Sequence, residues 1–182
     1  MLENKKIVLC VCGGIAAYKV VDVVSKLKKH GANVHVAMSE AAAKFVTPLT
    51  FQSISNNLVT TSLYADMGNP GINHILLAQE ADLFVVAPAT ANIIGKIANG
   101  IADDIISTSI IAAKAPVLLV PAMNTAMYEN PIVQNNIEKL KSFGYQFMEP
   151  EMGTMAMKSE KDGAGRLPDP ITIVNCILEM EL

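Results

Sequence analysis

The sequence has no apolar run of the roughly 18 to 20 residues that a membrane-spanning helix requires. The longest candidate, around residues 105–113, is interrupted by Ser107, Thr108 and Ser109. The first residues lead directly into a strand-like run, without the apolar region and cleavage site of a signal peptide. We therefore expect a cytoplasmic protein that makes no contact with a membrane.

Charged residues are also few: they make up 17% of the 182 residues, and the formal net charge is −3. Neutralising nucleic-acid phosphates takes an excess of lysine and arginine, so we expect no nucleic-acid partner. Hydrophobic residues reach 51%. A fraction this high favours either a sheet that is buried on both faces or extensive contacts between subunits.

Cysteine is rare, and its spacing argues against the common metal sites. Cys10 and Cys12 alternate on one predicted strand, and Cys176 lies in an apolar segment near the C-terminus. This is not the spacing of a metal-binding motif, so we expect three reduced core cysteines and no metal. The chain has no internal repeat, and its length fits one domain.

Strand-like and helix-like segments alternate along the chain. Residues 7–11 form a continuous apolar run that stops at a glycine pair, and apolar residues then recur at helical spacing up to residue 27. Further strands are predicted at residues 34–38, 83–87, 117–120 and 145–148, and helical segments at residues 39–44, 93–98, 104–113 and 132–142. This alternation predicts an α/β fold with a doubly wound parallel sheet.

Two stretches match neither pattern. Residues 56–73 are polar and rich in turn-forming residues, and residues 149–170 contain several glycines and prolines. Irregular segments of this length within a compact domain are usually functional loops. We therefore interpret residues 149–170 as a flap, and both stretches as candidates for the site.

The segment Pro121-Ala-Met-Asn124 follows the predicted strand at residues 117–120 and places an amide side chain at its carboxyl end. In open α/β sheets, ligands bind at this edge. Thr125, Met127 and Tyr128 follow instead of a simple turn. The segment is therefore predicted to present side chains to a ligand.

A glycine turn, Gly13-Gly14-Ile15, joins the first predicted strand to the first helix. Such a junction aims backbone N–H groups at an anion, but tight turns of this kind also use glycine without any ligand. At the end of the second strand, Ser39 stands where a dinucleotide site requires an acidic residue. A serine there suits a terminal phosphate, although it can also simply cap the next helix.

The third predicted strand ends in Pro88-Ala-Thr90-Ala91-Asn92, so small and amide-bearing residues again lie at a carboxyl edge. Asp103 and Asp104 then place negative charge at the start of the next helix. Asn92 and Asp103 could be nothing more than caps. The recurrence of such residues at successive strand ends nevertheless favours one shared ligand site.

Of the three histidines, His74 is the one expected in a polar loop. His30 ends a lysine-rich helix, and His35 alternates within a strand. A lone histidine is usually structural, so the residues alone leave the role of His74 open.

Seven motifs occur together and in order. They are the Gly13-Gly-Ile-Ala-Ala-Tyr-Lys19 turn, Ser39-Glu-Ala-Ala, Phe45-Val-Thr-Pro48, Asn73-His-Ile75, Pro88-Ala-Thr-Ala-Asn92, Pro121-Ala-Met-Asn124 and Gly165-Arg-Leu167. From about Lys5 to Val174, the chain resembles the flavin-containing cysteine decarboxylase family. The resemblance is strongest to the branch that converts 4′-phosphopantothenoylcysteine to 4′-phosphopantetheine in coenzyme A synthesis. It implies a flavodoxin-like, Rossmann-like three-layer α/β/α fold, bound FMN, and homotrimers or homododecamers with the flavin at the subunit interface.

The resemblance also implies roles for individual residues. His74 matches the histidine that assists oxidation of the substrate's thiol by the flavin, and Asn124 matches the asparagine that binds the substrate's carboxylate. The residues that match flavin and phosphate contacts are Gly13, Gly14, Ile15, Ser39, Thr90, Ala91 and Asn92. We further expect substrate contacts from Met127, Lys158 and Arg166.

The flap departs from the family pattern. The family has an Ala-Cys-Gly segment shortly before the Gly-Arg pair, and its cysteine helps to protonate and reduce the ene-thiol left after decarboxylation. Here Met157 or Ser159 stands at that position, and neither side chain replaces a thiol. Oxidation of the thiol by FMN and loss of carbon dioxide should survive this change. The reductive half-reaction needs another proton donor, such as Lys158 or Lys161.

Three functions therefore stay open. The first is decarboxylation of 4′-phosphopantothenoylcysteine, because the cationic flap suits a phosphorylated acidic substrate; a phosphopantothenate–cysteine ligase, fused or separate, is then the expected partner. The second is oxidative decarboxylation of a peptide's C-terminal cysteine, which does not need the flap thiol. The third is a non-catalytic, FMN-binding regulatory subunit of the same fold.

Overall fold

A five-stranded parallel sheet forms the centre of the computed structural model, which describes residues 2–64, 73–153 and 163–182. Its strands are β1 (Lys6–Val11), β2 (Asn33–Met38), β3 (Leu83–Ala89), β4 (Val117–Pro121) and β5 (Gln146–Phe147). They lie in the order β2-β1-β3-β4-β5. The chain therefore moves outward from β1 to β2 and then returns past β1 to β3, which creates a switch point between β1 and β3.

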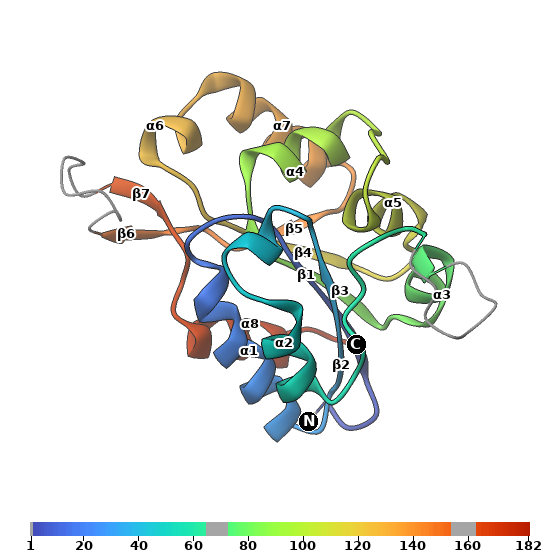
Figure 1. Ribbon diagram of the computed structural model, residues 1–182. Helices are drawn as coiled ribbons and strands as arrows, with labels where there is room; N and C mark the ends of the chain where they lie inside the picture. Colours follow the sequence, from blue (N-terminus) through green and yellow to red (C-terminus); the bar gives the residue numbers. More distant parts are fainter. Residues whose placement is uncertain (1, 65–72, 154–162) are drawn as a thin grey trace.

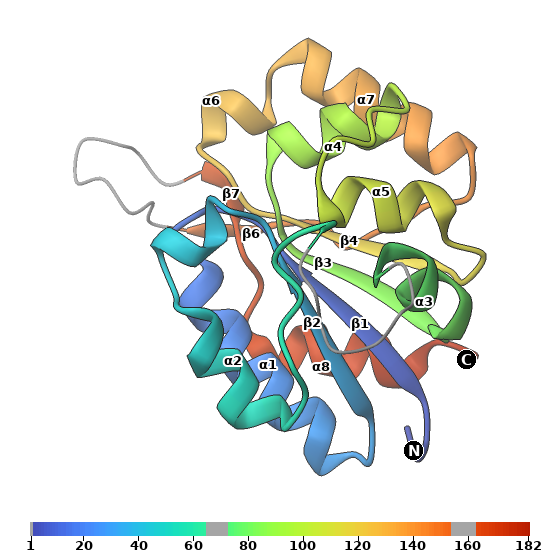
Figure 2. The same ribbon diagram turned by 45° about the vertical axis from the view of Figure 1, so that its right-hand side comes forward.

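Helices cover both faces of this sheet (Figures 1 and 2). One layer contains α1 (Ala17–Lys29), α2 (Pro48–Ser55) and α8 (Pro170–Glu179). The other contains α3 (Asn73–Glu80), α4 (Ala91–Ala98), α5 (Ile105–Ala112) and α7 (Pro131–Ser142). The predicted three-layer α/β/α fold is confirmed. No helix in the described ranges has the length and apolar character needed to cross a membrane.

Strand β1 shows why the strands read as continuous apolar runs. Ile7 and Leu9 point into the core on the α1 side, whereas Val8 and Cys10 point into the core on the α5 side. A strand buried on both faces needs apolar residues at every position. Cys10 and Cys12 are buried as predicted, whereas Cys176 on α8 is only partly buried and packs against the edge of the core.

The helix predicted at residues 39–44 is a single 3-10 turn, η1 (Ala42–Lys44). The physical reason lies at Pro48. Steric contact with the proline ring holds the preceding residue in an extended conformation, and Thr47 has ψ 148°. The chain therefore leaves its first turn and begins α2 anew, with Pro48 in the first helical turn.

The two stretches without a clear pattern contain short elements. Within residues 149–170, β6 (Glu151–Gly153) and β7 (Gly163–Arg166) pair antiparallel, so the flap has a two-stranded base. A short helix, α6 (Thr125–Tyr128), lies beside β7 (Figure 1). Thr60 forms an isolated bridge with Ala37, and α3 begins at Asn73. Residues 65–72 and 154–162, and with them Lys158, lie outside the described ranges.

Candidate active site

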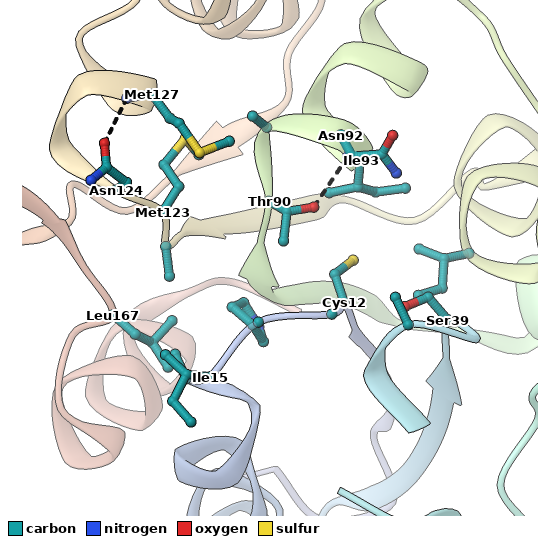
Figure 3. Close-up of a pocket in the computed structure, with 18 of the residues that line it drawn as sticks. Cys12, Ile15, Ser39, Thr90, Asn92, Ile93, Met123, Asn124, Met127 and Leu167 are labelled. Carbon is teal, nitrogen blue, oxygen red and sulfur yellow. Dashed lines mark hydrogen bonds between the residues drawn. The ribbon is translucent and has the colours of Figure 1, made fainter. Parts of the chain in front are cut away.

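A cavity of about 1160 Å³ opens at the carboxyl edge of the sheet (Figure 3). Its wall contains all the cofactor contacts expected from the sequence and three of the expected substrate contacts. These residues are Gly13, Gly14, Ile15, Ser39, Thr90, Ala91, Asn92, Asn124, Met127 and Arg166. They converge because the chain leaves neighbouring strands β1 and β3 toward opposite faces of the sheet, which opens a crevice between them.

The two glycines of the first turn serve different purposes. A Cβ atom on Gly13 would lie 2.5 Å from Cβ of Ala41, so this glycine lets the turn pack against the segment after β2. A Cβ atom on Gly14 would meet nothing closer than Cγ of Pro88 at 4.0 Å. Gly14 thus faces the open space of the cavity, where a ligand can approach its backbone.

The N-terminus of α1 suits an anion. Its N-cap is Ala16, which makes no side-chain capping hydrogen bond, and the first turn contains no acidic residue. The N–H groups at a helix start carry partial positive charge and need acceptors. Because Ile15 and Ala16 line the cavity, a phosphate there would supply the acceptors.

Ser39 and Thr90 each cap the chain that follows them while facing the cavity. Oγ of Ser39 accepts a hydrogen bond from N–H of Ala42 at 3.1 Å. Oγ1 of Thr90 accepts one from N–H of Ile93 at 3.4 Å and caps α4. A hydroxyl that accepts one hydrogen bond still has a proton to donate, so capping and phosphate binding are compatible at Ser39.

The side chain of Asn124 is oriented by the helix that follows it. Its Oδ1 accepts hydrogen bonds from N–H of Ala126 at 2.8 Å and N–H of Met127 at 3.3 Å, which caps α6 (Figure 3). The amide oxygen is therefore committed to the helix start. Asn124 also lines the cavity, and an amide side chain contains N–H donors, the kind of group that binds a carboxylate.

His74 does not lie in the cavity of its own chain. It is the second residue of α3, so the prediction of a polar loop was wrong; the polar residues before it precede a helix start. α3 packs against α5, and none of its described residues belongs to the cavity wall. Nδ1 of His74 is buried and has no hydrogen-bond partner within the described ranges.

Two cations at the cavity share one carboxylate. Nζ of Lys19 and Nη2 of Arg166 each lie 3.5 Å from Oδ1 of Asp169. The Lys19 ammonium is buried and forms no hydrogen bond within the described ranges. Two positive charges against one negative charge leave this end of the cavity cationic. Sequence reasoning did not single out Lys19, although it ends the glycine-turn motif one helical turn after Ala16.

A second charged group lines the wall formed by α4 and α5. Nζ of Lys96 donates to Asp103 at 2.6 Å and to Asp104 at 2.8 Å. Burial is the largest single influence on the pKa of Asp104 and pulls it upward, but the hydrogen bonds from Lys96 and Ser107, together with the charge of Lys96, outweigh burial, so the pKa lies below its usual value. Burial, followed by the charge of Asp104, raises the pKa of Cys12 to about 12. Cys12 therefore lines the cavity as a neutral thiol.

The fold and the cavity define a class of α/β proteins that bind a phosphorylated cofactor at the switch point of a parallel sheet. The chain belongs to the Flavoprotein family, whose model matches residues 1–181.

Two relatives illustrate its place in this family. The chain is 51% identical, over 174 residues, to the coenzyme A biosynthesis bifunctional protein CoaBC of Bacillus subtilis, covering 96% of the chain and 42% of that protein. It is 45% identical, over 178 residues, to the probable phosphopantothenoylcysteine decarboxylase of Streptococcus mutans, covering 97% of the chain and 98% of the relative. The chain thus spans less than half the length of the bifunctional relative.

Solved structures give the same picture. One neighbour is a cysteine-to-serine mutant of PPC decarboxylase complexed with pantothenoylaminoethenethiol, with a TM-score of 0.82 and 27% identity over 97% of both chains. Another is a mutant of EpiD complexed with a substrate peptide, with a TM-score of 0.83 and 26% identity over 97% of this chain and 99% of the other. EpiD is a peptidyl-cysteine decarboxylase.

Proposed function

We propose that the chain catalyses the FMN-dependent decarboxylation of 4′-phosphopantothenoylcysteine to 4′-phosphopantetheine. The observation that carries the proposal is the place of Asn124, which lies in the wall of the same cavity as the glycine turn, Ser39 and Thr90. The Streptococcus relative, matched over nearly its full length, supports the same reaction. In this proposal residues 1–182 act as an FMN-binding decarboxylase domain with a flap at about residues 149–170.

The described residues fit FMN. Gly14 leaves room for a phosphate, the start of α1 offers N–H groups, and Ser39 retains a hydroxyl proton. Thr90, Ala91 and Asn92 form the wall between this turn and Asn124. When bound there, FMN supplies an acceptor for the two electrons of thiol oxidation and later the donor that returns them.

The substrate carries a carboxylate and a phosphate, and the cavity has a place for each. Asn124 would hold the carboxylate, with Met127 beside it, while Lys19 and Arg166 would face the phosphate. A charge-assisted hydrogen bond to a phosphate is stronger than a neutral one, so this end favours a phosphorylated ligand. Lys158 remains a proposed further contact from outside the described ranges.

His74 is proposed to act in the cavity of a neighbouring subunit. It does not line the cavity of its own chain, and the adjacent Ile75 is 37% exposed. Phe45, Leu49 and Leu58 are more than half exposed, an amount of apolar surface that favours subunit contacts. We therefore propose a homotrimer, or a homododecamer built from trimers, in which the imidazole of one chain serves as base for a substrate held by another.

Two further elements of the proposal rest on the relatives. A ligase that supplies the cysteinyl substrate is proposed as partner, fused or separate, because the Bacillus and Escherichia coli relatives are bifunctional coenzyme A proteins. A cytoplasmic location is proposed because the relatives serve coenzyme A synthesis. The three cysteines, all of them free, are compatible with a reducing compartment.

A second candidate is oxidative decarboxylation, which one observation favours: residues 149–170 contain no cysteine. The overall reaction of the first candidate exchanges the carboxylate for a proton and is redox-neutral, so it must return electrons to the substrate. Oxidative decarboxylation of a peptide's C-terminal cysteine leaves them on the cofactor. The second candidate therefore requires an external oxidant for each turnover.

Anaerobic turnover separates these candidates. With purified protein, FMN and 4′-phosphopantothenoylcysteine, we expect many molecules of carbon dioxide per flavin and a flavin that regains its oxidised colour. About one carbon dioxide per flavin, with a bleached flavin and an ene-thiol product, would favour the oxidative reaction instead. No carbon dioxide from either this substrate or a cysteine-terminated peptide would reject both.

Gly14→Ala tests the phosphate turn. The added methyl group enters open cavity space, so the unfolding temperature of the apoprotein should stay unchanged. FMN affinity should fall by about 5- to 160-fold, since a misplaced methyl costs about 1 to 3 kcal/mol. The matched variant Gly13→Ala places its methyl against Ala41 and should lower stability by a similar free energy. Undiminished FMN affinity in Gly14→Ala would show that the phosphate of FMN does not bind at this turn.

A further inference from the structure

Strand β7 lies directly against the segment that carries Asn124. N–H of Met123 donates a hydrogen bond to the carbonyl oxygen of Gly165 at 2.9 Å. Gly165 has φ +130°, and a Cβ atom there would lie 2.2 Å from the carbonyl oxygen of Met123. This backbone contact therefore requires glycine, both for its conformation and for its close approach.

A second glycine makes the next contact along the same strand. A Cβ atom on Gly163 would lie 2.4 Å from Oγ1 and 2.7 Å from Cγ2 of Thr125. Gly163 and Gly165 are both buried, so the close packing is part of the folded interior. The strand thus touches Met123 and Thr125, the two residues on either side of Asn124.

The hairpin that contains β7 is anchored at its other end as well. Hydroxyl Oη of Tyr128, on α6, donates to Oε2 of Glu149 at 2.9 Å. Oε1 of Glu151, in β6, accepts a hydrogen bond from N–H of Asp169 at 3.1 Å. These bonds hold the residues that flank the hairpin, and β7 itself is held by its pairing with β6.

We infer that Gly163 and Gly165 are positioning residues for Asn124, because their missing Cβ atoms let β7 pack closely against Met123 and Thr125. This packing sets where α6 begins and therefore where the Asn124 amide lies on the cavity wall (Figure 3). A shift of about 1 Å in a group that holds a substrate can cost on the order of 100-fold in rate. The inference rests on the proposed function insofar as Asn124 holds the substrate's carboxylate.

Gly163→Ala is the variant that tests this inference in the FMN-loaded protein. We expect KM for 4′-phosphopantothenoylcysteine to rise on the order of tenfold, with FMN affinity within about twofold of the wild type. Thr125→Ala in the same chain removes Oγ1 and Cγ2 and leaves Cβ at 3.1 Å, so the double variant should recover most of the loss. Gly165→Ala meets a backbone oxygen, so Thr125→Ala should not rescue it.

Gly95→Ala is the matched control, since its added Cβ would meet Nδ2 of Asn136 at an ordinary 3.8 Å. An unchanged KM in Gly163→Ala, or a raised KM that Thr125→Ala fails to lower, would overturn the inference. Equal losses of FMN and substrate affinity would also overturn it, because they would indicate collapse of the whole cavity.

Amide hydrogen exchange gives a readout that needs no turnover. The N–H groups of Ala126 and Met127 are protected by Oδ1 of Asn124, so Gly163→Ala should speed their exchange while exchange in α4 stays unchanged. Unchanged exchange at both amides would reject the positioning role. If the wild-type protein shows no turnover while Gly163→Ala still speeds exchange at these amides, the proposed function is rejected and the positioning role stands.

Discussion

Replacing Asn124 by aspartate should lower kcat/KM by about 100-fold or more, while the protein stays folded and keeps its FMN. Aspartate is as good an N-cap as asparagine, so its oxygen can still accept from Ala126 and Met127. The Asn124→Asp substitution removes the N–H donor and sets a negative charge against the substrate's carboxylate. Like charges brought together in this way cost several kcal/mol.

Two further variants separate the charge from the cap. Asn124→Ser keeps a capping oxygen without adding charge, so its kcat/KM should lie between wild type and Asn124→Asp. Asn124→Ala also loses the cap, which costs about 1 kcal/mol of stability. The measurements are steady-state kinetics, FMN titration and thermal unfolding. An Asn124→Asp protein with unaltered KM would show that Asn124 is only a helix cap.

The convergence of the cavity residues could be predicted from the sequence because buried parallel strands leave a strong signal. Continuous apolar runs mark β1, β3 and β4, and the residues directly after them must meet at one edge of the sheet. Asn124 and Thr90 were therefore placed by the pattern alone. The glycine pair was found in the same way. The sequence could not show that Gly13 serves close packing and Gly14 leaves space in the cavity, because the room at each glycine depends on neighbours such as Ala41.

Contacts between distant segments left no such signal. The pairing of β6 with β7 involves short strands rich in glycine, whose sequence favours loops. Lys19 belongs to a helix with several lysines, and only the fold brings it to Arg166 and Asp169. The Ser39 hydroxyl accepts a hydrogen bond from N–H of Ala42, the first residue of η1, and still has a proton to donate, so both of its predicted interpretations stay open.

His74 shows a different limit. The polar residues before it predicted a loop, yet α3 starts there, and His74 is not among the residues that line the cavity of its own chain. A pattern in one chain carries no information about which cavity a side chain reaches once chains assemble. The family resemblance supplied a role for His74, and the neighbouring subunit as the place for that role is our proposal.

His74→Asn should therefore retain FMN but lose on the order of 100- to 10,000-fold in the rate of flavin reduction by substrate, because a base is removed and not a packing group. Stopped-flow absorbance of the flavin under air-free conditions measures this rate. Full-speed reduction in the variant would exclude His74 as the base.

Mixed oligomers decide which cavity His74 serves. His74→Asn and Asn124→Asp chains, each nearly inactive alone, should regain about a quarter of wild-type activity when co-expressed in equal amounts, because random assembly pairs an intact Asn124 cavity with an intact neighbouring His74 at that frequency. Chains carrying different tags allow the mixed species to be isolated. If His74 acted within its own chain, every cavity in the mixture would lack one of the two groups, and activity would stay at the level of the separate variants.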